Sequence, residues 1–151
     1  IKYWQNKFSH FGIAENRLIF SGISENRETH LAQYQNIDIA LDPFPFNGAT
    51  TTFEALAMGI PVITLKGKYF VDRTAAAILN AARLNNFIAH TNKEYIELAR
   101  NLSTDIDILE GIRYGLREKL ITSPLCQGKP YAQFIESAYQ TMWRNWCSEY
   151  A

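Results

Sequence analysis

Short apolar runs alternate with helical patterns along the chain, and this alternation is its clearest structural signal. The runs are rich in Ile, Val, Leu or Phe and are bounded by Gly, Pro or Asn, which predicts buried β-strands. Because the runs are almost continuously apolar, both faces of each strand are expected to be covered. The expected strands are residues 17–21, 37–41, 61–65 and a shorter one at 86–90.

The segments between and after these runs show helical spacing of apolar residues or helix-capping residues. Gly12 is expected to end the first helix, and Ser24 is the expected N-cap of the second. Thr91 and Glu94 have the spacing of a capping box. The expected helices are residues 1–12, 24–34, 51–58, 74–83, 91–102, 105–120 and 131–150.

Strands that alternate with helices indicate an α/β fold, with a Rossmann-like parallel sheet flanked by helices. A chain of 151 residues is expected to form one domain, residues 1–151. The helices at about 105–150 follow the last strand. They are expected to pack on the sheet or to reach toward another part of the polypeptide.

The composition changes this picture little, but it limits the possible ligands. Fifteen basic and fifteen acidic residues cancel, which argues against nucleic acid or an anionic membrane as a bulk partner. A polyphosphate ligand would have to be held by local geometry.

Cys126 and Cys147 have no metal-ligand spacing, so a reduced, cytoplasmic chain with neither zinc nor disulfides is expected. No apolar stretch is long enough to span a bilayer. Because the chain starts at Ile1, we expect it to be part of a longer protein.

The loop after the second expected strand carries the strongest chemical signal. It reads DPFPFNGATTTFEALAMG and leads into the start of a helix. In parallel sheets, ligands bind beyond the carboxyl ends of the strands, and free N–H groups at a helix N-terminus attract anions. Small residues let a ligand approach the backbone, and three hydroxyls add donors. The sequence therefore predicts a phosphate site built from Asn47, Gly48, Ala49, Thr50, Thr51 and Thr52.

Glu54 lies one turn into this helix and has two interpretations. Its carboxylate could accept hydrogen bonds from ribose hydroxyls, or it could complete a capping box with Thr51. Spacing alone leaves the two about equal. The loop has neither the Gly-Lys-Ser/Thr of a Walker motif nor the GxGxxG pattern, so by itself it indicates an anion site and no more.

Other candidates have simple structural explanations. His30 alone would be a surface histidine of a helix, and His10 and His90 are interpreted as structural. Asp105 and Asp107 have the DxD form of metal-dependent glycosyltransferases, but their place at a helix start favours capping. Asp42 is interpreted as a turn-initiating residue. Arg73 has two interpretations of about equal weight, a phosphate or interdomain role and a plain surface charge. Core or interdomain packing is favoured over a platform for a sugar for the aromatic set Tyr131, Phe134, Tyr139, Trp143 and Trp146.

Several separated motifs resemble the protein O-GlcNAc transferase family, including its SPINDLY-like O-fucosyltransferases. They are ENRLIFSG, the stretch HLAQYQNIDIALDPFPFNGATTTFEALAMGIPVITLKG, VDRTAAAILN, YIELARNLSTD, LREKLITSPLC and FIESAYQTMWRNWC. They occur in order over almost the whole chain. The resemblance implies the C-terminal, nucleotide-binding half of a GT-B glycosyltransferase. It also implies inverting, metal-independent sugar transfer to Ser or Thr of proteins, with TPR repeats in the same polypeptide.

The resemblance also assigns roles to individual residues. His30 matches a histidine that packs on the nucleobase, and Arg27 stands at a lysine that contacts the same region. Thr50 and Thr51 match two threonines on the diphosphate, and Glu54 replaces an Asp on the ribose. Catalytic residues are expected mainly in the missing N-terminal half, so this fragment should bind without turnover. A purely binding or structural domain remains the alternative from a different class.

Two departures concern the donor. Ala49 stands where the animal enzymes carry a histidine near the phosphates, and Gln33 stands where they carry an arginine near the nucleotide. The FPFNGATTT loop is more similar to bacterial and SPINDLY-type members. UDP-GlcNAc is therefore the first expectation for the donor and GDP-fucose the second.

Overall fold

The computed structural model describes residues 1–150, with the side chain of Tyr150 left aside, and confirms the α/β class. The chain divides into two compact units, residues 1–32 and 33–151. The first unit contains two short helices and one 3₁₀ turn. Their bounds are α1 Lys2–Ser9, η1 Glu15–Arg17 and α2 Arg27–Ala32.

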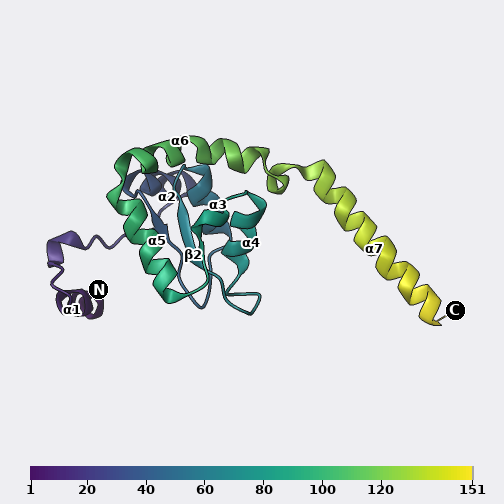
Figure 1. Ribbon diagram of the computed structural model, residues 1–151, viewed down its shortest axis with the longest axis horizontal. Coiled ribbons are helices and arrows are strands. Elements are labelled where there is room, and N and C mark those ends of the chain that lie inside the picture. Colours follow the sequence, from purple (N-terminus) through teal and green to yellow (C-terminus); the bar gives the residue numbers. More distant parts are fainter. Residues whose placement is uncertain (151) are drawn as a thin grey trace. The chain divides into compact units, whose positions relative to one another are not determined.

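The second unit holds the sheet and most of the helices (Figure 1). Its strands are short, and 3₁₀ turns precede β1, β3 and α7. In chain order the elements are η2 Gln33–Asn36, β1 Ala40–Leu41, α3 Thr50–Ala57, β2 Val62–Leu65, α4 Thr74–Ala81, η3 Asn85–Phe87, β3 Ile88–Ala89, α5 Asn92–Thr104, α6 Ile106–Thr122, η4 Pro124–Cys126 and α7 Gly128–Tyr150.

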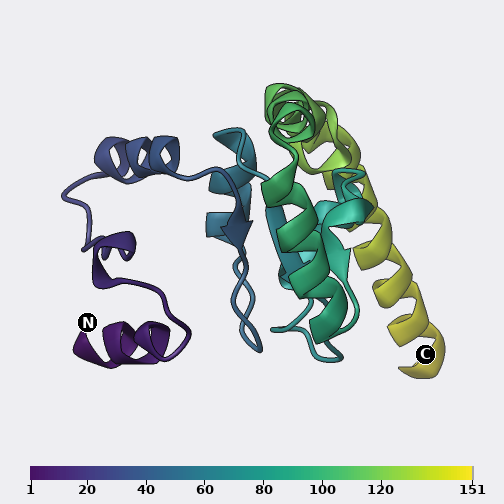
Figure 2. The same ribbon diagram turned by 60° about the vertical axis from the view of Figure 1, so that its left-hand side comes forward.

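The three strands pair in parallel in the order β1-β2-β3. Ala40 lies opposite Val62, and Thr64 lies opposite Ile88. Since both crossovers advance in the same direction, α3 and α4 cover one face of β2, and α5 covers the other (Figures 1 and 2). The carboxyl ends of all three strands therefore meet at one edge.

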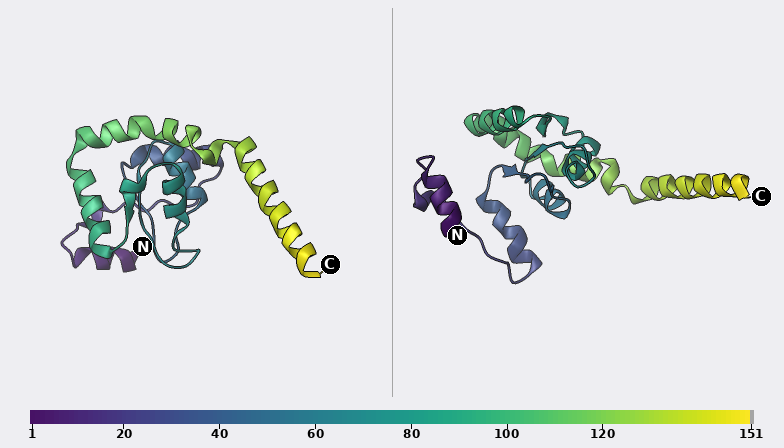
Figure 3. Two further views of the ribbon diagram at one scale, coloured as in Figure 1. Left: turned by 45° about the vertical axis from the view of Figure 1, so that its right-hand side comes forward. Right: turned by 90° about the horizontal axis from the view of Figure 1, so that it is seen from below.

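The core lies between these layers and is aliphatic. Leu56 on α3, Ile63 on β2, Leu79 on α4 and Leu116 on α6 are completely buried. α6 contacts both α3 and α5, and Figure 3 shows it crossing the ends of these helices. Burying an aliphatic side chain of this size contributes about 1.5–3 kcal/mol, so these four positions hold the layers together.

Two predictions about the first unit are wrong. Residues 17–21 form no strand: η1 ends at Arg17, Leu18 is extended but outside the sheet, and Ile19 is 92% exposed. A strand needs a neighbour that pairs with it through a ladder of backbone hydrogen bonds, and among the described residues 17–21 belong to no such ladder. The cap of α2 is Asn26, not Ser24, because the Thr29 N–H donates to Asn26 Oδ1 at 2.9 Å.

Candidate functional site

The predicted phosphate loop runs from the carboxyl end of β1 to the start of α3. Helix α3 begins at Thr50, with Ala49 as its N-cap and without a side-chain capping bond. The N–H groups of Thr50, Thr51 and Thr52 have no acceptor among the described residues. An uncapped helix start presents these donors together with the positive end of the helix dipole, which is the arrangement that binds phosphate.

The residues of the loop divide into exposed and buried ones. Ala49, Thr50 and Thr51 are exposed, and Gly48 is half-buried. Asn47 is buried; its Nδ2 donates to the Pro43 carbonyl at 3.0 Å, and its N–H donates to the Val71 carbonyl at 2.9 Å. Asn47 therefore braces the loop, whereas the exposed residues offer their backbone and hydroxyls to a ligand.

Glu54 does not form the capping box that its spacing allows. The helix starts one residue before Thr51, so Thr51 lies inside the first turn and cannot serve as the N-cap. Glu54 is half-buried on α3. Burial of Tyr34 raises the pKa of its hydroxyl, and the negative charge of Glu54 raises it further. The proposed contact of Glu54 with a ribose stays a prediction.

Tyr34 is a site residue that sequence reasoning missed. It lies in η2, and its hydroxyl donates to the main-chain carbonyl of Thr51 at 3.4 Å. Tyr34, Asp42, Thr51 and Thr52 help to line a small cavity of about 170 Å³ between β1 and α3. The only available signal was a tyrosine just before a strand, which is too common to indicate a site.

Asp42 directly follows β1 and accepts three hydrogen bonds from other parts of the chain. It is 5% exposed, and its carboxylate accepts hydrogen bonds from the Gly48 N–H and the Thr64 hydroxyl, both at 2.7 Å. The Tyr95 hydroxyl donates to the Asp42 carbonyl at 2.9 Å. Burial raises the pKa of Asp42, although the two hydrogen bonds to its carboxylate lower it in part. Turn initiation thus explains only part of its role.

The two residues expected near the nucleobase lie on α2, in the first unit. Arg27 is exposed and begins the helix, and His30 is half-buried one turn later. This spacing places both side chains on one side of the helix. Their contacts with a base stay a prediction.

The DxD motif is explained by helix capping. Asp105 is the N-cap of α6, and its Oδ1 accepts a hydrogen bond from the Ile108 N–H at 3.0 Å. Likewise, Thr91 caps α5 through the Glu94 N–H, as predicted, and the Glu94 carboxylate accepts from the N–H of His90. Among the described residues, no three His, Cys, Asp or Glu side chains converge on a common metal position.

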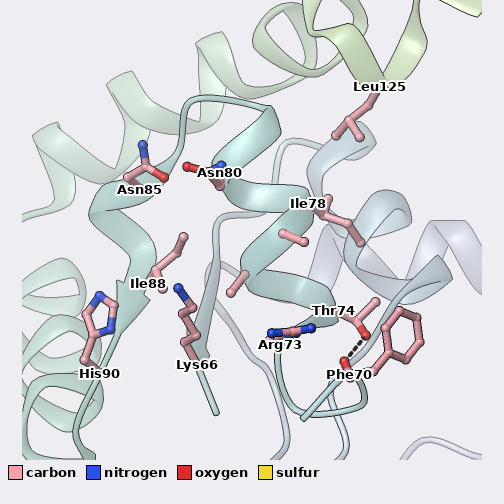
Figure 4. A pocket seen from close by; sticks show the side chains of 12 residues that line it. Lys66, Phe70, Arg73, Thr74, Ile78, Asn80, Asn85, Ile88, His90 and Leu125 are labelled. Atoms are coloured by element: carbon pink, nitrogen blue, oxygen red, sulfur yellow. Dashed lines mark hydrogen bonds between the residues drawn. The ribbon is translucent and has the colours of Figure 1, made fainter. Parts of the chain in front are cut away.

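A larger cavity lies beside α4 and β3, and none of its lining residues belongs to the phosphate loop. Its volume is about 790 Å³, and Figure 4 shows Lys66, Arg73 and His90 around it. It is lined by no acidic side chain, and its floor includes Ala76, Ala77, Ile78 and Ile88. Size alone does not make it the site, because the open helix start and the loop hydroxyls are not among its lining residues.

No helix in the part of the chain that the structure describes is both long enough and apolar enough to cross a membrane. Cys126 and Cys147 are free thiols, the first exposed and the second half-buried.

The parallel sheet, with helices on both faces and an uncapped helix start at its carboxyl edge, places the chain in the Rossmann-like α/β class. A family model, described as glycosyl transferase family 41, matches residues 2–135. The chain therefore belongs to glycosyltransferase family 41.

Named relatives agree with this assignment. The chain is 40% identical over 118 residues to the probable UDP-N-acetylglucosamine–peptide N-acetylglucosaminyltransferase SPINDLY of Hordeum vulgare, covering 78% of this chain and 12% of the relative. It is 30% identical over 135 residues to the UDP-N-acetylglucosamine–peptide N-acetylglucosaminyltransferase of Caenorhabditis elegans, covering 89% of this chain and 12% of that relative. The chain thus spans about an eighth of these relatives.

A solved structure matches almost the entire chain. A mutant O-GlcNAc transferase of Thermobaculum terrenum superposes with a TM-score of 0.90 at 34% identity, over 99% of this chain and 29% of that one. This likeness confirms the expected Rossmann-like half of a GT-B glycosyltransferase.

Proposed function

We propose that this domain binds a nucleotide-sugar donor and stabilises the departing diphosphate during transfer of the sugar to Ser or Thr of a protein. The proposed reaction inverts the configuration at the anomeric carbon of the sugar, needs no metal and takes place in the cytoplasm. UDP-GlcNAc is the proposed donor. The N-terminal half of the same polypeptide would supply most catalytic groups, and TPR repeats would present the acceptor, so this fragment alone would bind without turnover.

The open start of α3 is the observation that carries this proposal. Three N–H groups that have no acceptor within residues 1–150, and the exposed Thr50 and Thr51 hydroxyls, lie at the carboxyl edge of the sheet. Such donors are already oriented before the ligand arrives, so they stabilise charge that develops on a leaving phosphate without reorganisation. They also supply this stabilisation in a chain with no net positive charge.

Calorimetric titration with UDP, GDP, UDP-GlcNAc and GDP-fucose tests the proposal. UDP and UDP-GlcNAc are expected to bind more tightly than the guanine nucleotides. GDP-fucose stays the second candidate because the FPFNGATTT loop resembles that of SPINDLY-type members. Tighter binding of GDP would select it. If a folded sample binds none of the four ligands, the proposed site is wrong.

Removing one hydroxyl tests the position of the phosphates. Thr51→Ala is expected to weaken UDP binding by about 1–2 kcal/mol, the scale of one charge-assisted hydrogen bond. Thr141→Ala, the same substitution at an exposed position of α7, is the matched control and should leave the affinity unchanged. Equal affinities for Thr51→Ala and the unsubstituted chain would place the phosphates elsewhere.

The alternative of a non-catalytic binding domain is tested with the longer protein. Transfer of labelled sugar to a Ser- or Thr-containing acceptor, reduced in Thr51→Ala and retained in Thr141→Ala, would support turnover. Nucleotide binding without any transfer by the longer protein would support the binding-domain alternative.

A further inference from the structure

Asp42 links four elements of the second unit although it faces the protein interior. Its carboxylate accepts hydrogen bonds from Gly48 before α3 and from Thr64 on β2, both at 2.7 Å. Its carbonyl accepts one from Tyr95 on α5, at 2.9 Å. Because Asp42 itself follows β1, the end of one strand is tied to its neighbour, to a covering helix and to the phosphate loop.

The bond from Gly48 is the one that reaches the ligand side. Residues 43–46 of the loop are exposed, and the loop is held near its junction with α3 by bonds of Asn47 and Gly48. A methyl group at Gly48 would lie 2.5 Å from Thr51 Oγ1 and 3.2 Å from Asp42 Oδ1. The Thr51 hydroxyl and the Asp42 carboxylate therefore both pack closely against Gly48, and moving Gly48 would displace the hydroxyl.

We propose that Asp42 is a positioning residue for the diphosphate: it holds Gly48 so that the open N–H groups of α3 and the Thr51 hydroxyl converge on the ligand. This inference rests on the proposed function of the loop. Asp42 is buried, and each of its carboxylate oxygens accepts a hydrogen bond from a protein donor. It acts through Gly48 and does not bind the nucleotide itself.

The role depends on an acceptor in the right place rather than on negative charge. A fixed charge near the phosphates would oppose their binding, whereas an amide oxygen can accept the Gly48 N–H in the same position. Asp42→Asn should therefore preserve positioning, and Asp42→Ala should lose it. Thr64→Val removes the other partner of the carboxylate but leaves the Gly48 bond in place, so it is the matched control for a general loss of stability.

The experiment measures the affinity for UDP and the Tm of each variant. Asp42→Ala is expected to weaken UDP binding about tenfold or more, the effect of losing one well-aligned polar contact. Asp42→Asn should restore the affinity to within about threefold of the unsubstituted chain. Thr64→Val should lower the Tm much as Asp42→Ala does, yet bind UDP within about twofold of the unsubstituted chain. A purely structural role would lower the affinity of Asp42→Ala and Thr64→Val equally, which would overturn the proposal.

One replacement variant and one contradicting outcome complete the test. If Asp42→Ala does not fold, Asp42→Ser replaces it, because the serine hydroxyl lies one bond short of the carboxylate oxygens that accept from Gly48 and Thr64. If Asp42→Asn binds as weakly as Asp42→Ala, the acceptor role is wrong.

Amide hydrogen exchange of Gly48, followed by NMR without nucleotide, separates this inference from the proposed function. Slow exchange in the unsubstituted chain and in Asp42→Asn, with fast exchange in Asp42→Ala, would support positioning even if UDP does not bind. Equal exchange in all three would overturn the inference.

Discussion

At the scale of single residues, the buried carboxyl of Asp42 makes stability depend on pH. Burial raises its pKa above the ordinary value of 3.8. The folded state then binds the proton more tightly than the unfolded state does. The free energy of unfolding therefore falls as the pH rises from 3.8 through the folded pKa.

Asp42→Asn removes this titrating group, so its stability should depend on pH differently from that of the unsubstituted chain. The stability of the variant relative to the unsubstituted chain should increase as the pH rises from about 3.5 to 7, because only the unsubstituted chain then buries a charge. Urea unfolding at a series of pH values measures this difference. Groups shared by both chains cancel, so a difference that stays flat or decreases with pH would contradict the assignment.

The Tyr95 hydroxyl donates a hydrogen bond to the main-chain carbonyl of Asp42. Burial, and then the charge of Asp42, raise the pKa of Tyr95 to about 12, so the phenol keeps its proton and its hydrogen bond through neutral pH. Tyr95→Phe is expected to lower the free energy of unfolding by about 1 kcal/mol, while the edge contact with Phe44 remains. Thermal unfolding checks this. Tyr114→Phe, at a side chain that is 94% exposed, should have no effect.

At the scale of elements, the end of α3 depends on Gly59. Its φ of 77° lies in the left-handed region, and an added methyl group would lie 3.2 Å from the Arg113 carbonyl on α6. Gly59→Ala is therefore expected to destabilise the chain by about 1–2 kcal/mol. Gly111 lies inside α6 with nothing within 4 Å of the added methyl group.

Gly111→Ala is consequently the matched control for Gly59→Ala. It should stabilise the chain by about 0.5–1 kcal/mol, because alanine favours the helix interior. Opposite signs for the two substitutions in urea unfolding are expected. If both destabilise, the contact between Gly59 and α6 is not the cause.

Local sequence signals predicted the elements of the second unit better than those of the first. Glycine at the end of α3, Thr91 before α5 and Asp105 before α6 mark helix ends through bonds within a few residues. The apolar run at residues 17–21 predicted a strand and was wrong, because a strand also needs a partner that the local sequence does not contain.

At the scale of the whole molecule, α7 contributes little to the core. No described side chain of residues 128–149 is buried, and Phe134, Tyr139 and Trp143 are each more than 60% exposed. Trp143 stacks on Trp146 with ring centroids 5.4 Å apart. The expectation for these aromatic residues was core or interdomain packing. Core packing is not observed among the described residues, and packing against another part of the polypeptide stays a prediction.

Truncation tests how much of the chain the sheet needs. A chain that ends at Gln127 is expected to lose less than about 0.5 kcal/mol of stability, because no buried side chain is removed. A chain that ends at Thr104 also loses α6, with the buried Leu109, Leu116 and Leu120, and should not fold. Circular dichroism during heating distinguishes the two. A large loss of stability in the first truncation would show that α7 packs on the sheet.

The sequence alone determined the α/β class, the main helices of the sheet unit and the loop for which a phosphate site is proposed. Hydrophobic period, capping residues and glycines are local properties, so they can be recognised without the fold. Only the tertiary structure decided how the loop is held. Asp42 meets Gly48, Thr64 and Tyr95 across 6, 22 and 53 positions. Nothing near Asp42 in the sequence distinguishes it from an aspartate that starts a turn, because its partners arrive only when the strands and α5 come together.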